Sequence, residues 1–221
     1  MADQRTKNTR LDTWTNNKKI PNVIREPILT ALSHYPELRQ TRIDFVFTQK
    51  LRKSIMAARP IAASAIGLRN QRRYQILIRP VFKLAHTIEP IHHVSPQVLI
   101  GWIGHELGHI MDYETRNAWG LIQFGILYGL SKKYVRKAER IADTYAVERG
   151  MGGYIIATKQ FILGHSGLPD KYRRKIARLY LSPDDIVALV ASLQNEDIEN
   201  RDSMLEEEVR STAETNEKEQ Q

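Results

Sequence analysis

Two histidines four residues apart flank a glutamate in the middle of an otherwise uncharged segment. The pentapeptide HELGH begins at His105 and ends at His109, and Glu139 and Asp143 follow later, again four residues apart. Positions i and i+4 share one face of a helix, so His105 and His109 can direct two imidazole nitrogens at one point. Glu106 projects beside that face. A second helix can bring Glu139 to the same point.

The residues before this motif predict a buried helix. Ser95 and Pro96 form a helix start, with a side-chain cap followed by proline at the first helical position. The run 98–104 continues into the motif without a charge. A carboxylate at Glu106 on such a helix costs several kcal/mol unless something pairs with it. The alternative interpretation is a core helix with two hydrogen-bonded histidines and no metal.

Two imidazoles and one carboxylate form the donor set of many catalytic zinc sites. Three protein ligands leave the fourth position of a tetrahedral Zn²⁺ ion open to water, as hydrolysis requires. The chain has no cysteine, which excludes disulfides and thiolate zinc sites. The sequence therefore predicts Zn²⁺ as the cofactor, held by side chains of the two motifs.

These motifs resemble those of the gluzincin class of zinc metallopeptidases. The pattern is similar to that of the heat-shock and prenyl-protein processing proteases and of the minimal soluble gluzincins. The resemblance implies that His105, His109 and Glu139 bind zinc and that Glu106 is the general base. It also implies that Asp143 is the carboxylate that orients a ligand histidine.

The resemblance covers roughly residues 95–150. The metzincins, another zinc class, require a glycine three residues after the second histidine and a third histidine six residues after it. Asp112 and Thr115 stand at those positions, so that class is excluded. Asp112 could ligate a metal in principle, but three residues after His109 we expect it to hydrogen-bond near the helix end.

By this resemblance the protein would be a zinc-dependent metalloendopeptidase acting on a peptide or protein substrate. A zinc-activated water would attack the peptide carbonyl, and Glu106 would accept its proton and pass it to the leaving amine. A further donor would stabilise the oxyanion. His165, in a turn after the zinc helices, is the candidate for this role, and Tyr145 and Tyr154 are alternatives.

Small residues on both helices would let them approach closely. Each glycine in a helix interior costs about 1 kcal/mol, so a stripe of three needs a reason. The stripes are Gly101, Gly104 and Gly108 on the first helix and Ala138, Ala142 and Ala146 on the second. We expect them to face each other; chance recurrence of common residues is the alternative.

We expect an α+β fold, with a small, mostly antiparallel N-terminal sheet followed by a helical zincin core that carries the zinc site on its central helix. The segments 41–48 and 74–79 alternate like strands, and 57–68 is weakly patterned. In gluzincin-like folds an edge strand above the zinc binds the substrate backbone, and 74–79 is the candidate. Helices are expected at 23–33, at 118–130, around Glu139, and near 151–163, 169–180 and 183–194.

The net charge of +8 conceals an asymmetry. Residues 196–221 carry ten acidic and three basic side chains, so residues 1–195 carry +15. We expect a flexible segment at 1–20, one metallopeptidase domain at 21–195 and an acidic, disordered tail at 196–221. The basic body could attract nucleic acid or anionic lipid, with the tail as competitor. A solubilising tail on a basic surface is the simpler reading.

The segment 118–130 has one polar side chain other than a tyrosine hydroxyl, and the basic run 132–137 follows it. It is too short to span a bilayer, so it is a buried helix, a dimer contact or, with the basic run, a peripheral contact of 118–137 with an anionic membrane. Residues 1–19 are polar and lack an apolar signal core. We therefore expect a cytoplasmic location, with membrane association as an alternative.

Two other functions remain open on the sequence alone. One is a non-catalytic, zinc-stabilised binding module that unfolds without its metal. The other is a nucleic-acid-associated protein in which the basic body matters more than the zinc site.

Overall fold

The computed structural model describes residues 11–51, 54–65, 71–83, 88–164 and 168–196. Its strands and first helices are β1 (Lys18–Lys19), α2 (Arg25–Ser33), β2 (Arg42–Phe47), β3 (Met56–Pro60), α3 (Ala62–Ala65), β4 (Arg73–Ile78), β5 (Val81–Lys83) and β6 (Ile88–Pro90). The later helices are α4 (Pro96–Thr115), α5 (Ala118–Leu130), α6 (Lys132–Ala146), α7 (Gly152–Gly164) and α8 (Asp170–Leu179). Residues 183–196 are also helical. The expected mixed α+β layout is confirmed at this level.

Short turns of other helix types connect these elements. They are 3-10 turns at Asn22–Ile24, Pro36–Leu38 and Ile91–His93 and a π-helical turn at Val147–Met151. Inside the π turn Gly150 has a φ of 74°, a left-handed conformation that glycine adopts without strain. This turn redirects the chain from α6 into α7.

The four-stranded sheet has the order β1-β2-β4-β3. The pairs β1–β2 and β2–β4 are parallel and only β3–β4 is antiparallel, so the prediction of a mostly antiparallel sheet is wrong. The physical reason lies in the connections. The crossover through α2 makes β1 and β2 run the same way, and β3 lies at the outer edge instead of between β2 and β4. A separate hairpin pairs β5 with β6.

Strand β4 is interior, between β2 and β3, so the prediction that 74–79 is the edge strand is wrong. Its side chains Tyr74, Ile76 and Ile78 are fully buried on one face. Alternation of this kind reports a buried face and carries no information on which strands flank it. The edge strand on this side is β3, which ends at Pro60, a residue tolerated at sheet edges.

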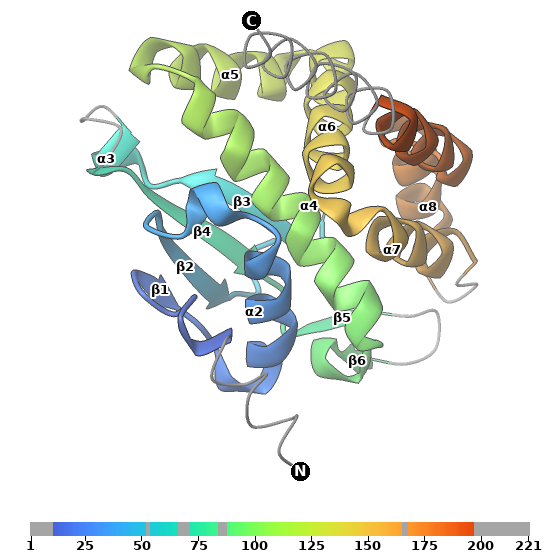
Figure 1. The fold of residues 1–221 in the computed structure, drawn as a ribbon, viewed down its shortest axis with the longest axis horizontal. Helices are drawn as coiled ribbons and strands as arrows, with labels where there is room; N and C mark the ends of the chain where they lie inside the picture. The colour runs from blue at the N-terminus through green and yellow to red at the C-terminus, as the bar shows by residue number, and fades with distance from the viewer. Residues whose placement is uncertain (1–10, 52–53, 66–70, 84–87, 165–167, 197–221) are drawn as a thin grey trace, which may run out of the picture.

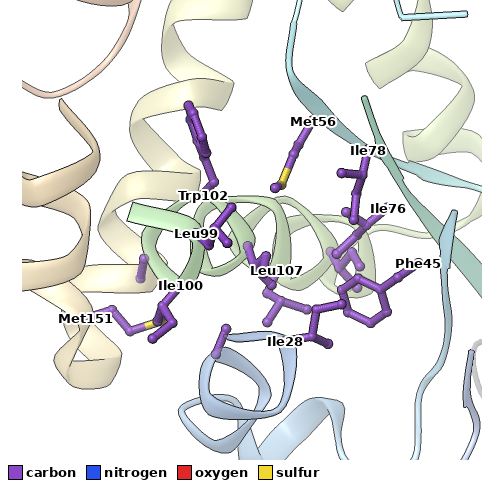
Figure 2. Packing of buried hydrophobic residues seen from close by; sticks show 14 of the residues in the cluster. Ile28, Phe45, Met56, Ile76, Ile78, Leu99, Ile100, Trp102, Leu107 and Met151 are labelled. Atoms are coloured by element: carbon purple, nitrogen blue, oxygen red, sulfur yellow. The ribbon is translucent and has the colours of Figure 1, made fainter. Parts of the chain in front are cut away.

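Helix α4 runs through the centre of the molecule, with the sheet on one side and α6, α7 and α8 on the other (Figure 1). It contacts α2, β3, α6 and α7. Figure 2 shows Leu107 of α4 with Ile28 of α2, Phe45 of β2 and Ile76 of β4 in one core around this helix. Full burial of each such side chain contributes about 1.5–3 kcal/mol.

The helix start predicted at Ser95 is confirmed. The Ser95 side chain accepts a hydrogen bond from the amide of Val98, and Pro96 occupies the first turn. Every residue from Val98 to Ile110 is buried. The hydroxyl of Tyr35 donates to the carbonyl of Gly104 at 2.6 Å, which ties the centre of α4 to the chain after α2.

The small-residue prediction holds at one glycine of three. A Cβ on Gly108 would lie 2.3 Å from the carbonyl oxygen of Ala142, so the backbones of α4 and α6 are in direct contact there. Gly101 instead meets the backbone of α7, and Gly104 meets the side chain of Met151. All three glycines of α4 allow close packing, but only Gly108, nearest the C-terminus of the helix, faces α6.

The folded part of the chain begins before the predicted boundary at residue 21. Strand β1 pairs with β2, and Lys18 Nζ donates to the carbonyls of Leu38 and Thr41 at 3.1 and 2.6 Å. Residues 1–10 and 197–221, half of the predicted flexible segment and nearly all of the acidic tail, lie outside the described residues. Among the residues that are described, no helix is long and apolar enough to cross a membrane.

Candidate metal centre

Helices α4 and α6 bring the two sequence motifs together. One ligand atom from each of His105, His109 and Glu139 lies within 4.8 Å of the others, and all three residues are buried. His105 Nε2 lies 3.1 Å from Glu139 Oε2, and His109 Nε2 lies 3.4 Å from the same oxygen. The three residues predicted as zinc ligands therefore form one cluster.

Two of the distances in the cluster are close to those between ligands of a tetrahedral metal ion. Zinc binds imidazole nitrogen and carboxylate oxygen at about 2.0–2.2 Å, which separates neighbouring ligand atoms by about 3.4 Å. The two distances to Glu139 Oε2, 3.1 and 3.4 Å, are close to that value. The donor types suit Zn²⁺, and the cluster, which extends to 4.8 Å, would have to contract around a bound ion.

Asp143 occupies the place predicted for the carboxylate that orients a histidine. His105 Nδ1 lies 2.8 Å from Asp143 Oδ1, which directs Nε2 of the same ring at Glu139. The Asp143 carboxylate also accepts hydrogen bonds from Lys159 Nζ at 3.0 Å and from the amide of Leu181 at 3.1 Å. Lys159 is buried on α7, and neither it nor Leu181 was foreseen from the sequence.

The second histidine is held differently. His109 Nδ1 is buried and has no hydrogen-bond partner among the described residues. Its ring instead stacks on Tyr113, with centroids 6.2 Å apart and planes at 16°. His109 Nδ1 thus lacks the carboxylate partner that His105 Nδ1 has, and packing against Tyr113 holds that side of the ring.

Glu106 lies between the cluster and the free edge of β3. Its Oε2 accepts a hydrogen bond from the amide of Ala58 at 2.6 Å, and the hydroxyl of Tyr113 donates to the carbonyl of Ala58 at 3.3 Å. Ile55 and Ile61 bond to β4, so by alternation both backbone groups of Ala58 point away from the sheet. Burial raises the pKa of Glu106, against the lowering effect of the two histidines.

The cluster is strongly coupled electrostatically. Burial alone would lower the pKa of His105, but Asp143 and Glu139 outweigh it and raise that pKa to about 9. Burial alone would raise the pKa of Glu139, yet His109 and His105 hold it well below the usual range. Likewise the pKa of Asp143 is lowered despite burial, by Lys159 and His105. Two ionised carboxylates are thus buried together, and both form ion pairs, Glu139 with His105 and Asp143 with His105 and Lys159.

Tyrosine side chains that were not predicted complete the surroundings. The hydroxyl of Tyr128, on α5, donates to Glu139 Oε1. The ring centroids of Tyr180 and His105 lie 5.1 Å apart. Lys159 Nζ lies 4.1 Å from the centroid of the Tyr180 ring. Burial raises the pKa of both hydroxyls, so they are protonated donors at neutral pH. Tyr128 was not predicted because it lies in the apolar segment 118–130, where a tyrosine is expected to pack in the core.

Of the three residues considered for the oxyanion, the structure describes Tyr145 and Tyr154. His165 lies outside the described residues. The Tyr145 ring lies under Arg149, and the Tyr154 ring contacts His34 edge-on. Asp112 pairs with Arg116 at 2.8 Å, as expected for a carboxylate near the helix end.

A cavity of about 1390 Å³ lies next to Tyr128, and neither Glu106 nor any of the three clustered residues lines it. Tyr128, whose hydroxyl donates to Glu139, is one of the lining residues and so connects the cavity to the cluster. Tyr172 and Ile55 also line it. Among the described residues its lining includes no carboxylate and six cationic side chains, Arg79, Lys132, Lys171, Arg174, Lys175 and Arg178.

The arrangement as a whole can hold one cation and place a carboxylate next to it. Three donors converge, Asp143 orients one of them, and Glu106 stands beside the pair of histidines at a free strand edge. No model of a protein family, no curated protein and no solved structure matches this chain.

Proposed function

We propose that this protein is a zinc-dependent metallopeptidase that hydrolyses peptide bonds. The observation that carries the proposal is the buried triangle of His105, His109 and Glu139 with the carboxylate of Glu106 beside it. The oriented His105 imidazole supports it, because ligating histidines usually donate their other nitrogen to a carboxylate.

His105, His109 and Glu139 would hold the zinc ion. Bound zinc would supply Lewis-acid chemistry and lower the pKa of a coordinated water. Glu106 would act as the general base: its raised pKa makes the carboxylate a better proton acceptor than an exposed glutamate. The Ala58 amide fixes one of its oxygens and leaves the other available.

Tyr128 is the donor that we propose for the oxyanion in place of His165. Its protonated hydroxyl donates to Glu139, and Tyr128 is also one of the residues that line the cavity, from which a substrate carbonyl would approach. A fixed hydroxyl in a site shielded from water stabilises developing negative charge more than water does. Tyr128→Phe should therefore lower kcat more than it raises KM.

The cavity is the route by which we propose that substrate enters. It extends from Ile55, next to β3, to Tyr172 on α8. Its cationic lining favours peptide segments that carry aspartate or glutamate, because opposite charges attract across a partly desolvated surface.

A zinc-stabilised module without catalysis is the second candidate. The hydrogen bond between Glu106 and the Ala58 amide favours it, because a carboxylate engaged by the backbone can be a structural tie between α4 and β3. The nucleic-acid alternative stays a prediction, as does the cytoplasmic location.

Cleavage of a peptide library, read by mass spectrometry, tests the proposal and separates these candidates. Zinc-loaded protein should generate new termini, a chelator should abolish them, and readded zinc should restore them. Glu106→Gln should keep its zinc and lose cleavage by a factor of at least about 100. Glu26→Gln, on the exposed surface of α2, is the matched control. Cleavage by Glu106→Gln at the wild-type rate would refute the assignment.

A further inference from the structure

Helix α5 is apolar on both of its faces, yet it is buried on only one. Leu121 and Phe124 are the buried residues of its thirteen. Phe124 packs edge-on against Tyr113, and Tyr128 on the same face reaches Glu139. The helix carries no charged side chain. A helix that is hydrophobic all round is normally buried all round, so one side of α5 lacks its natural environment.

The opposite face carries four large apolar side chains in water. They are Trp119, Ile122, Ile126 and Leu130, with 73, 45, 55 and 82% of their surfaces exposed. Spacings of three and four residues place them on a single stripe. Half of the exposed large hydrophobic residues in the described part of the chain belong to this stripe. Contiguous apolar surface of this kind marks a site of association.

A cluster of positive charge follows the stripe directly. Lys132, Lys133, Arg136 and Lys137 are all exposed in the first turns of α6. The described part of the chain provides no salt-bridge partner for any of them. The first turn of α6 contains no acidic residue, so its lysines oppose the positive end of the helix dipole. An external anion would relieve both effects.

The place of α5 in the fold leaves its stripe accessible. The helix lies at the rim of the molecule, beyond the end of α4, and its main neighbour is α6 (Figure 1). A helix of this length extends about 20 Å, which is shorter than the roughly 30 Å of a bilayer core. It therefore suits an orientation parallel to a membrane surface, where tryptophan is favoured.

We propose that α5 lies in the surface of a membrane that contains anionic lipid. The stripe enters the boundary of the acyl chains, and the basic cluster of α6 contacts the headgroups. A second copy of the chain is a poorer occupant, because it would bring another basic cluster toward the first. The proposal goes beyond peptide hydrolysis and does not depend on zinc.

Flotation of the full chain with lipid vesicles tests this proposal. The protein should float with vesicles of phosphatidylcholine and phosphatidylglycerol and stay at the bottom with phosphatidylcholine alone. The double variant Ile122→Ser, Ile126→Ser should reduce the floated fraction by at least about tenfold. The variant Lys133→Glu, Lys137→Glu should reduce it by a similar factor and should resemble wild type in high salt.

A matched control is Val187→Ser, which replaces a side chain 56% exposed on a different helix and should float like wild type. Circular dichroism of each variant confirms the fold. Three results would each overturn the proposal: wild-type protein that stays at the bottom with anionic vesicles, stripe variants that float unchanged, or a vesicle-free dimer in sedimentation equilibrium that the stripe variants abolish. The last result would assign the stripe to a second copy of the chain.

Discussion

His105 Nδ1 lies 2.8 Å from Oδ1 of Asp143, and Asp143 itself is completely buried. The same carboxylate also accepts a hydrogen bond from Lys159 of α7, at 3.0 Å. One buried group thus links the ligand helix α4, its own helix α6, and α7. The geometry of the three candidate metal ligands and the packing of the helices therefore depend on the same side chain.

Asp143→Asn should weaken zinc binding by about 10–100-fold, because the imidazole loses the carboxylate that orients it. It should also destabilise the protein by about 3–5 kcal/mol, because Lys159 becomes a buried, unpaired charge. In the double variant Asp143→Asn, Lys159→Met the stability should recover while zinc affinity stays low. Urea denaturation and competitive zinc titration measure the two effects. Wild-type zinc affinity in Asp143→Asn would contradict the assigned role.

Gly108→Ala should loosen the contact between α4 and α6. The added Cβ would meet the Ala142 carbonyl at 2.3 Å, so the helices must separate, at a cost of about 1–3 kcal/mol. Zinc affinity should fall with it, although no ligand is changed. The control is Gly153→Ala on α7, where an added Cβ meets nothing within 4 Å. Equal zinc affinities in the two variants would show that the close approach does not position the ligands.

Zinc affinity should weaken as the pH falls. Without metal the pKa of His105 is raised to about 9, so below that pH the ring carries a proton that zinc must displace. Apparent affinity should therefore drop about tenfold for each pH unit below 9, with proton release on binding. Zinc titrations against a chelator of known affinity, in buffers of different ionisation enthalpy, measure both quantities. If the zinc affinity did not change between pH 6 and 8, His105 would be excluded as a ligand.

Charge reversal in the cavity should change substrate preference. Lys171→Glu with Arg178→Glu should lower kcat/KM for an acidic peptide by about tenfold and leave a neutral peptide of equal length nearly unaffected. Zinc stoichiometry should not change. Lys50→Glu, an exposed position outside the cavity lining, is the control. Parallel losses for both peptides would indicate general damage and not a substrate contact.

Much of the helical part of the fold could be predicted because its signals are local. The cap at Ser95 and the spacing of His105 and His109 define α4 without reference to any other element. These are relations within a few turns of helix, where sequence distance and spatial distance agree. The role expected for Asp143 came from the resemblance of its motif to that of the gluzincins, and not from the spacing alone.

Strand order and the outer partners of the site depend on tertiary contacts and were missed. Both β3 and β4 are short segments, and nothing in the sequence places Ala58 at the edge rather than Ile76. Lys159 and Tyr128 reach the site from α7 and α5, whose positions are set by packing against α4 and α6. Lys159 could have been noticed because it is a lysine within a mostly apolar segment. A lysine that such a segment buries requires an acidic partner.

The position of the metal is the claim on which the account depends most. In crystals of the zinc-loaded protein, anomalous diffraction at the zinc absorption edge should give one strong peak between α4 and α6. The peak should lie about 2.0–2.2 Å from His105 Nε2, His109 Nε2 and a Glu139 oxygen, with Glu106 beside it and not bound to it. A peak that lies elsewhere, or none despite zinc in the crystal, would contradict the account.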